Sequence, residues 1–374
     1  MRFFFFVLRV LLRILYFFLK LFPVQNKIVF ISRASEHKPL DFVLLEKEIQ
    51  RRDPEMQLVF LCNKSEAEFQ ESVKSGLFYF RCMRELATAR ACMVERYCIP
   101  VSILKHRKSL VVVQVWHSLG AVKKFGYQTL DTYEGKSRVM AEAGKMHQNY
   151  SYITCASEVT RQIYAEAFRV PAEQIFVEGM PRIDYIVGSD LANYRIRERV
   201  YRRHPQLREK KTILYVPTFR KNATVDLAPI LENVDTNKYN LLIKLHPMDT
   251  PPEQAGEAIF SSMRTPDLMK ASDYFITDYS GTAFEACVLN KPLFFYVPDY
   301  EDYNVKRGLN VDLFEEYPDC TFKRFSDLMK VLGSGYYNYQ ELAAFRDRYV
   351  QTADTKNCKR IVNHLFEEME RYSS

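Results

Sequence analysis

One β-α-β stretch, residues 271–312, constrains the fold of this chain more than any other. Residues 274–277 (YFIT) are β-branched and aromatic, which predicts a short buried strand. An apolar helix follows and ends before Pro292, because proline cannot continue a helix. A second strand is expected over residues 293–297. This order predicts a parallel α/β sheet whose ligand lies at the carboxyl ends of the strands.

A turn rich in hydroxyl groups joins the first of these strands to the helix. It runs from Asp278 through Ser280 and Gly281 to Thr282. Thr282 and Glu285 have the spacing of a capping box, in which a hydroxyl and a carboxylate satisfy helix N–H groups. Unpaired amides and the helix dipole also favour a phosphate at such a place. The stretch therefore predicts a well-capped helix, an anion site, or both.

The first twenty-two residues contain no acidic side chain. At about 100° per residue, all the cations fall within a stripe of roughly 40°, namely Arg2, Arg9, Arg13 and Lys20. A signal peptide would need an unbroken apolar core and a cleavage site, and a spanning helix would carry cations near the bilayer centre. We expect an interfacial helix with its cationic edge on anionic headgroups. A deeply embedded helix, or one buried against protein, is the alternative.

The remaining chain alternates strands and helices, and 374 residues suffice for two α/β domains. Strands are expected at 27–32, 57–61, 92–94, 111–116, 152–155, 175–177, 213–217 and 241–245, and helices at 39–52, 157–168, 325–333 and 358–371. The expected organisation is an amphipathic membrane-anchoring helix (1–22), an N-terminal Rossmann-like domain (23–188), a charged linker (189–211), a C-terminal Rossmann-like domain (212–350) and a C-terminal helix (351–374).

Polar side chains follow the expected strands of the first half. His117 and Ser118 end the strand 111–116, and Lys123 comes shortly after, so a candidate base lies beside an anion-stabilising patch. Arg182 follows the strand 175–177, where its planar fork could bind phosphate or form a surface salt bridge with Asp184.

The second half repeats this arrangement. Thr218 and Arg220 follow one strand, and Lys244 and His246 lie at the end of the next. A histidine that merely satisfies a turn is the structural alternative for His246, as it is for His117. Five strand ends with histidine, arginine or hydroxyl groups together predict an active site.

Composition and missing motifs exclude several functions. The net charge of +7 favours anionic partners such as a phosphorylated substrate or a lipid surface. Basic and aromatic residues are not interleaved as in RNA-binding proteins, so no nucleic-acid partner is expected. The absence of a Walker A loop and a G-x-G-x-x-G motif argues against a kinase or a dinucleotide dehydrogenase. No cysteine pattern has zinc spacing, and the eight cysteines are expected to be reduced, buried and cytosolic. Since no clear carboxylate cluster is present either, the sequence does not require a divalent metal, and it identifies no cofactor.

The ordered set of motifs resembles the CDP-glycerol glycerophosphotransferase family, the teichoic acid primases and polymerases of Gram-positive bacteria. The resemblance covers about residues 23–370. It depends on Trp116-His117, Lys123-Lys124, Gly179-Met180-Pro181-Arg182-Ile183-Asp184, Pro217-Thr218-Phe219-Arg220, Lys244-Leu245-His246-Pro247, Ile276-Thr277-Asp278-Tyr279-Ser280, Asn290-Lys291-Pro292, Phe294-Phe295-Tyr296 and Lys306-Arg307-Gly308.

The resemblance implies a GT-B architecture, with two Rossmann-like domains facing across a cleft. It implies transfer of phosphoglycerol from CDP-glycerol to a hydroxyl of a prenyl-diphosphate-linked acceptor, with release of CMP, at the cytoplasmic face of the membrane. His117 would be the general base, and His246 would bind the pyrophosphate or assist the leaving group. The domain 212–350 would bind the donor. The expected substrate-binding residues are Ser118, Lys123, Arg182, Thr218, Arg220, Lys244, Asp278, Ser280, Gly281, Thr282 and Glu285.

Two departures from the family pattern keep alternatives open. The family usually has W-H-G-T-P where this chain has Ser118-Leu119-Gly120 after the histidine, and often D-Y-S-S where this chain has Gly281. CDP-ribitol or another CDP-polyol is therefore an alternative donor. A GT-B glycosyltransferase and a non-catalytic membrane scaffold are the alternative functions. No additional acceptor-binding domain is visible, which favours a primase slightly over a polymerase.

Overall fold

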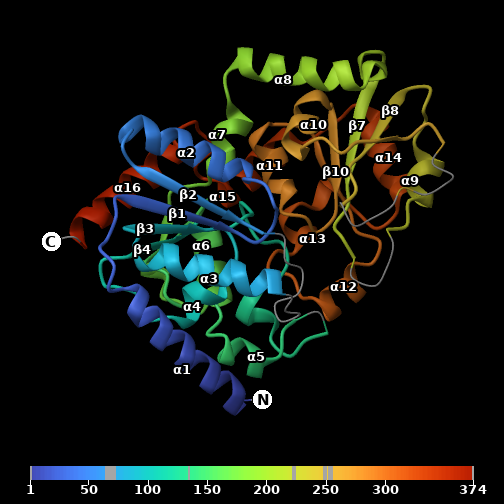
Figure 1. Ribbon diagram of the computed structural model, residues 1–374. Coiled ribbons are helices and arrows are strands. Elements are labelled where there is room, and N and C mark those ends of the chain that lie inside the picture. Colours follow the sequence, from blue (N-terminus) through green and yellow to red (C-terminus); the bar gives the residue numbers. More distant parts are fainter. Residues whose placement is uncertain are drawn as a thin grey trace. The chain divides into compact units, whose positions relative to one another are not determined.

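The computed structural model describes residues 2–63, 73–133, 135–220, 225–246, 251 and 256–372, and the chain falls into two units. The first unit comprises Met1–His117, Phe125–Tyr185 and Asp354–Ser374. The second comprises Ser118–Lys124 and Ile186–Ala353 (Figure 1). The short segment Ser118–Lys124 thus belongs to the second unit although residues of the first unit flank it on both sides.

The first unit is built on a six-stranded parallel sheet with the order β2-β1-β3-β4-β5-β6. Its central strands are buried on both faces, as expected for strands that helices cover on either side. The strands are β1 (Lys27–Ser32), β2 (Gln57–Cys62), β3 (Ala91–Val94), β4 (Val111–Gln114), β5 (Tyr152–Cys155) and β6 (Ile175–Val177). The predicted parallel sheet is confirmed, and each predicted strand lies within two residues of its observed bounds.

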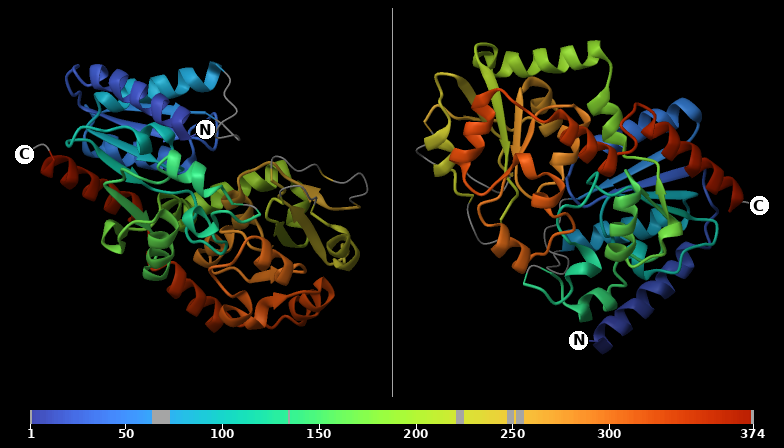
Figure 2. Two further views of the ribbon diagram at one scale, coloured as in Figure 1. Left: turned by 90° about the horizontal axis from the view of Figure 1, so that it is seen from below. Right: turned by 180° about the vertical axis from the view of Figure 1, so that it is seen from behind.

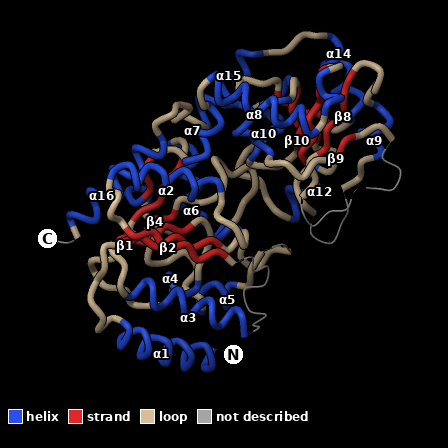
Figure 3. The backbone as a smooth tube through the Cα atoms, turned by 45° about the horizontal axis from the view of Figure 1, so that its top comes forward, coloured by secondary structure: helices blue, strands red, loops and turns tan. Residues whose placement is uncertain are grey.

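Helices cover both faces of this sheet. They are α1 (Arg2–Leu19), α2 (Leu40–Arg52), α3 (Val73–Ala87), α4 (Ile99–Ile103), α5 (Arg138–Ala143), α6 (Glu158–Phe168), α7 (Pro181–Val187) and α16 (Asn357–Arg371). Figure 3 shows α2 and α16 on one side of the strands and α3 and α4 on the other. On the first side, Phe30 of β1 packs in one apolar cluster with Phe42 and Leu45 of α2 and Ile361 and Leu365 of α16.

Helix α1 packs against α3 and α5, with the face opposite to the one expected. Arg13 donates from Nε to the carbonyl of Ile103 at 3.1 Å, and Lys20 donates to the carbonyl of Lys105 at 2.9 Å. Tyr16 is fully buried beside them. The expectation that the cationic edge meets headgroups is therefore wrong for Arg13 and Lys20, because both hydrogen-bond to the protein's own backbone.

The apolar arc of α1 and the residues just after it remain exposed. Large side chains that are more than half exposed are Leu11, Ile14, Phe17, Phe18, Leu21 and Phe22. Leu77 and Phe80 of the neighbouring α3 are exposed as well. Among the described residues, no helix has the length and apolarity needed to span a bilayer.

The second unit repeats the first architecture with a six-stranded sheet of order β12-β11-β10-β7-β8-β9, again parallel throughout. The strands are β7 (Lys211–Val216), β8 (Tyr239–Ile243), β9 (Ile259–Phe260), β10 (Tyr274–Thr277), β11 (Leu293–Tyr296) and β12 (Thr321–Phe322). The strands β9 and β12 were not predicted from the sequence, because two residues are too few to show the alternation of a strand.

Eight helices accompany this sheet in the described chain, and Figure 2 shows them from two further directions. They are α8 (Asp190–Arg203), α9 (Ala228–Asn233), α10 (Thr265–Ala271), α11 (Thr282–Val288), α12 (Tyr300–Lys306), α13 (Leu313–Glu316), α14 (Phe325–Ser334) and α15 (Tyr339–Tyr349). The charged segment around residues 189–211 is mostly the helix α8, which packs against α10 within the second unit.

Candidate active site

The polar residues of the second unit gather where its strand order reverses. The order turns back between β7 and β10, and ligands of open α/β sheets bind outside the carboxyl ends of strands at such a point. Three adjacent strands, β10, β7 and β8, end there. The residues that follow these ends are Thr218, Arg220, Lys244, His246, Asp278, Ser280, Gly281 and Thr282.

Asp278 joins the ends of β10 and β7. This buried carboxylate accepts a hydrogen bond from the backbone N–H of Thr218 at 2.9 Å. Its other oxygen lies 3.0 Å from Nη2 of Arg220. Asp278 therefore connects the segments that follow β10 and β7.

Arg220 is enclosed by carboxylates and tyrosine rings. A second carboxylate, Asp299, lies 3.3 Å from its Nη2, and the guanidinium stands over the rings of Tyr279 and Tyr303 at 5.2 and 4.7 Å. Burial opposes the charge, but Asp278 and Asp299 outweigh it and raise the pKa of Arg220. The guanidinium is thus a permanent cation held in a fixed orientation.

Thr218, Lys244 and His246 complete the edge. The Oγ1 atom of Thr218 is buried and has no hydrogen-bond partner among the described residues. Lys244 is half-buried, and burial lowers its pKa. His246 is exposed, with its ring 4.8 Å from that of Phe219, and the residues 247–250 that follow lie outside the described chain. A polar ligand would satisfy the Thr218 hydroxyl.

The N-terminus of α11 differs from the predicted capping box. Gly281 is the N-cap and has no side chain to cap with, Thr282 is already the first helical residue, and the backbone N–H of Thr282 donates to Oγ of Ser280 at 3.3 Å. The hydroxyl of Thr282 instead donates to Oγ of Ser280 at 2.9 Å. Glu285 is buried within the helix. The capping-box prediction is therefore wrong, and the hydroxyls of Ser280 and Thr282 form a pair at the turn. The helix ends at Val288, before Asn290, whose φ of +52° is left-handed.

In the first unit, Trp116, the residue before His117, has a strained backbone conformation. The strand β4 ends at Gln114, two residues earlier than expected, because Trp116 has a left-handed φ of +56°. Such a conformation costs roughly 1–3 kcal/mol. It is held by a hydrogen bond from the Trp116 N–H to Oε1 of Gln114 at 3.0 Å and by stacking of the indole on Phe125 at 4.8 Å.

The ring of His117 has a defined orientation. Its Nδ1 lies 3.2 Å from the carbonyl oxygen of Glu95. A carbonyl can only accept, so the proton of the neutral ring resides on Nδ1 and the lone pair on Nε2. This tautomer leaves Nε2 as the basic nitrogen.

Ser32 and Glu95 were not among the residues predicted from the sequence. Ser32 ends β1 and Glu95 follows β3, and the strand order of the first sheet reverses between these two strands. The hydroxyl of Ser32 donates to the buried carboxyl of Glu95, and burial raises the pKa of Glu95. The signal was present, since both residues end predicted strands, but neither belongs to a motif.

Arg182 is paired, but not with Asp184. Its guanidinium and its backbone N–H both bind the fully buried Asp41, with Nε 3.0 Å from Oδ2 and N 2.9 Å from Oδ1. Asp184 instead accepts from the backbone N–H groups of Asn357 and Cys358 at the start of α16. The surface salt bridge with Asp184 is thus wrong, and Arg182 belongs to a buried ion pair of the first unit.

Ser118 and Lys123 lie in the segment that belongs to the second unit. Lys123 forms an antiparallel bridge with Leu309, and Ser118 lies against the N-terminus of α11. The structure therefore places Ser118 with Gly281 and the other residues around the β7–β10 reversal. His117 and Arg182 belong to the first unit.

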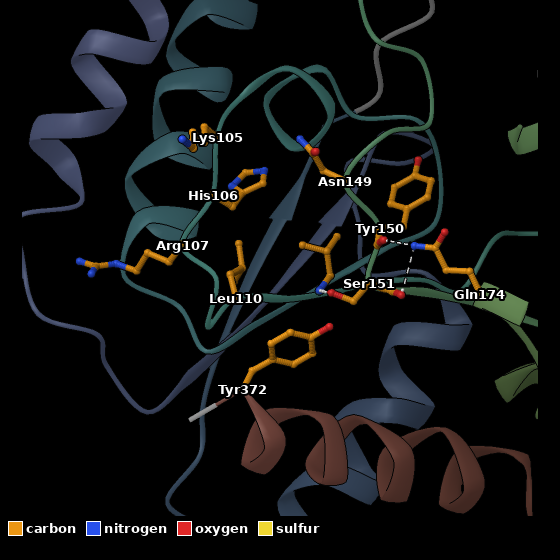
Figure 4. A pocket seen from close by; sticks show the side chains of 10 residues that line it. Lys105, His106, Arg107, Leu110, Asn149, Tyr150, Ser151, Gln174 and Tyr372 are labelled. Carbon is orange, nitrogen blue, oxygen red and sulfur yellow. Dashed lines mark hydrogen bonds between the residues drawn. The ribbon is translucent and has the colours of Figure 1, made fainter. Parts of the chain in front are cut away.

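A separate hollow of about 360 Å³ lies at the amino ends of β4, β5 and β6 (Figure 4). Several of its polar groups are already hydrogen-bonded within the protein: Nδ2 of Asn149 donates to three carbonyls, and Gln174 donates to the carbonyls of Tyr150 and Ser151. Arg107 binds the carbonyls of Ala87 and Phe22. Within the described ranges, no three His, Cys, Asp or Glu side chains are grouped as metal ligands.

The comparisons with known proteins cover nearly the whole chain. The family described as CDP-Glycerol:Poly(glycerophosphate) glycerophosphotransferase matches residues 14–367. The teichoic acid poly(ribitol-phosphate) polymerase of Bacillus spizizenii is 29% identical over 92% of this chain, which spans 57% of that polymerase. The teichoic acid ribitol-phosphate primase of the same organism is 28% identical, with 92% of each chain covered.

A solved structure shares the fold. The wall teichoic acid polymerase TagF superposes with a TM-score of 0.74 and 18% identity, over 100% of this chain and 99% of that chain. This likeness confirms the GT-B-type α/β fold with two parallel sheets. Because the family match extends over almost every element of both units, the chain belongs to the CDP-glycerol:poly(glycerophosphate) glycerophosphotransferase family.

Proposed function

We propose that this chain transfers a polyol phosphate from CDP-glycerol or CDP-ribitol to a hydroxyl of a prenyl-diphosphate-linked teichoic-acid-type acceptor, with release of CMP. The observation that carries the proposal is the edge around the β7–β10 reversal. There, the buried hydroxyl of Thr218, which has no partner among the described residues, belongs to a residue whose carbonyl accepts a hydrogen bond from Arg220, and the half-buried Lys244 follows the neighbouring strand β8. A diphosphate offers acceptor oxygens to all three.

The proposed chemistry assigns one role to each group. The acceptor oxygen forms a bond to the β-phosphorus of the donor, and the bond from that phosphorus to CMP breaks. The acceptor proton passes to Nε2 of His117, the nitrogen that the Glu95 carbonyl leaves basic. Phosphoryl transfer needs positioning and charge neutralisation above all, which we assign to Thr218, Lys244 and His246.

The remaining predicted residues support these groups. Asp278 ties β10 to β7, and Arg220 supplies positive charge while its two carboxylates hold it in place. We propose that the hydroxyls of Ser280 and Thr282 face the donor phosphates. Arg182 is the residue whose predicted role the geometry supports least, because the buried Asp41 already neutralises it.

The donor is proposed as a class. Both relatives described above are named for ribitol phosphate, whereas the family is named for glycerophosphate. CDP-glycerol and CDP-ribitol share the cytidine diphosphate and differ only in the polyol. The residues assigned here address the diphosphate and therefore suit both donors.

We further propose that α1 holds the protein on the cytoplasmic face of the membrane. The cations Arg13 and Lys20 and the buried Tyr16 face the protein, so the exposed arc is almost purely apolar. Soluble proteins rarely expose a contiguous apolar patch of this kind unless it binds something. An acyl-chain surface fits the arc and also places the enzyme where a prenyl-linked acceptor resides.

A donor screen tests the reaction class. Thermal unfolding of the full chain is measured with CDP-glycerol, CDP-ribitol, UDP-sugars and GDP-sugars. Stabilisation by a CDP-polyol alone supports the proposal, because a ligand that binds only the folded state raises its stability. Stabilisation by a nucleotide-sugar alone would favour a glycosyltransferase, and no shift with any nucleotide would favour a non-catalytic scaffold.

A further inference from the structure

The segment Ser118–Lys124 is built into the second unit by its own contacts. Asn310 donates from its backbone N–H to the carbonyl of Val122 at 2.8 Å and from its side chain to the carbonyl of Lys123 at 3.1 Å. The N–H of Lys124 donates to the carbonyl of Gly308 at 3.0 Å. This end of the segment is therefore anchored beside the loop that follows α12.

The other end of the segment is packed against α11. A Cβ atom added to Gly120 would lie 2.6 Å from the ring of the fully buried Phe284, so only glycine fits there. Leu119 is fully buried as well. The backbone that follows His117 is thus pressed directly onto the first turn of α11.

The side chain of Ser118 occupies the place that a side chain at residue 281 would take. A Cβ atom added to Gly281 would lie 2.1 Å from Oγ of Ser118 and 3.4 Å from its Cβ. The Ser118 hydroxyl is held in this place by donating to the carbonyl of Gly120 at 2.5 Å. A side chain at residue 281 would therefore have to displace the Ser118 hydroxyl.

We propose that Ser118 is a positioning residue for the donor: its side chain takes the place of a residue-281 side chain and holds the Ser280–Thr282 turn in the geometry that binds the donor phosphates. This role rests on the proposed function. It predicts that Ser118 and Gly281 are coupled, since a side chain at residue 281 and the Ser118 hydroxyl compete for the same place.

A double-mutant cycle tests the coupling. The variants are S118G, G281S and S118G/G281S, with G333S as the matched control because a Cβ at Gly333 of α14 meets nothing within 4 Å. Tm and the KM for the CDP-polyol that the wild type uses are measured. G281S is expected to lower Tm and raise KM through the collision. S118G is expected to raise KM roughly tenfold with kcat nearly unchanged, a loss typical of one interaction.

The double variant separates the possible outcomes. Recovery of both Tm and KM towards the wild-type values, with G333S like the wild type, supports the positioning role. Recovery of Tm with KM unaffected throughout would show a purely structural contact and overturn the role. Additive losses of Tm in the double variant would show that the two residues are not coupled.

The wild type separates a failure of this role from a failure of the proposed function. A wild type that binds and uses neither CDP-polyol contradicts both, whereas additive KM effects in an active wild type contradict this role alone.

Discussion

At the scale of single residues, two buried threonines at adjoining strand ends differ in one respect. The hydroxyl of Thr277, at the end of β10, donates to the carbonyl of Val216 at 2.6 Å. The hydroxyl of Thr218, just after β7, has no partner among the described residues. An unsatisfied buried hydroxyl costs about 1–3 kcal/mol. Its presence at the strand-order reversal is explained if a ligand completes its hydrogen bonding.

Replacing Thr218 by valine should separate stability from binding. The valine keeps the shape and removes the unpaired hydroxyl, so the free energy of unfolding should stay equal or rise, by up to about 1–3 kcal/mol. The affinity for a CDP-polyol should fall roughly tenfold, as one hydrogen bond is lost. Chemical denaturation and calorimetric titration measure the two effects.

Thr277→Val is the matched control. It removes the hydrogen bond from this hydroxyl to the Val216 carbonyl, so this variant should lose stability, by about 0.5–1.5 kcal/mol. Its donor affinity, measured where the protein is folded, should remain that of the wild type. A T218V variant that unfolds as easily as T277V and binds donor normally would contradict the role of Thr218.

At the scale of helices and strands, the local sequence pattern predicted the positions of the strands. Runs of β-branched and aromatic residues gave strands within two residues of β1 to β8, β10 and β11, and His117 and Asp278 were placed correctly at strand ends. Contacts between distant segments were not predictable in this way. The pairing of Arg182 with Asp41 joins residues 141 positions apart, and the contact of Ser118 with Gly281 depends on how a separate segment packs.

The orientation of α1 shows the same limit. The periodicity identified a cationic stripe and an apolar arc, but periodicity alone does not say which of them faces the protein. Backbone carbonyls of Ile103 and Lys105 satisfy Arg13 and Lys20, and this decided the orientation.

Membrane binding should therefore depend on the apolar arc. Charging it with L11E/F18E should lower binding to phosphatidylglycerol–phosphatidylcholine vesicles roughly tenfold or more, because each side chain contributes about 1.5–3 kcal/mol when buried. Leu191→Glu on α8 is the control, since Leu191 is as exposed as Leu11, at 58%. Cosedimentation measures the binding. Equal binding by L11E/F18E and the wild type would refute the anchor.

Helix α16 docks onto the first sheet through a titratable pair. Nδ1 of His364 lies 2.6 Å from Oε1 of Glu178, and its ring stacks on Tyr152 at 4.2 Å. Burial alone would lower the pKa of His364, but the hydrogen bond and charge of Glu178 outweigh it and raise this pKa.

The raised pKa fixes the sign of a pH dependence. The folded state holds this proton more tightly than the unfolded state, so the contribution is complete below the ordinary pKa of about 6.5. It is lost as the pH rises through the raised value. The free energy of unfolding should therefore fall as the pH rises above about 6.5, and H364Q should lack this part of the decline. His37→Gln, at an exposed histidine, should keep it. Identical profiles for H364Q and the wild type would show that the pair does not titrate.

At the scale of the whole molecule, both units follow one plan. Each has a six-stranded parallel sheet, and each carries polar groups where its strand order reverses, at β1–β3 in the first unit and β7–β10 in the second. His117 belongs to the first unit and the proposed diphosphate ligands to the second, except that Ser118–Lys124 continues from His117 into the second unit. The proposed base and the proposed donor site thus belong to different units of one chain.

The most direct test of this account is CMP release by the full chain on vesicles, from CDP-glycerol and from CDP-ribitol, with a prenyl-diphosphate-linked glycan acceptor. The wild type should release CMP from one or both donors, and His117→Ala should lower kcat by roughly 10²–10⁴-fold with its Tm retained. His204→Ala, which alters a histidine at the C-cap of α8 and before the amino end of β7, should match the wild type. Undiminished CMP release by a folded His117→Ala variant, or none from either donor by the wild type, would contradict the account.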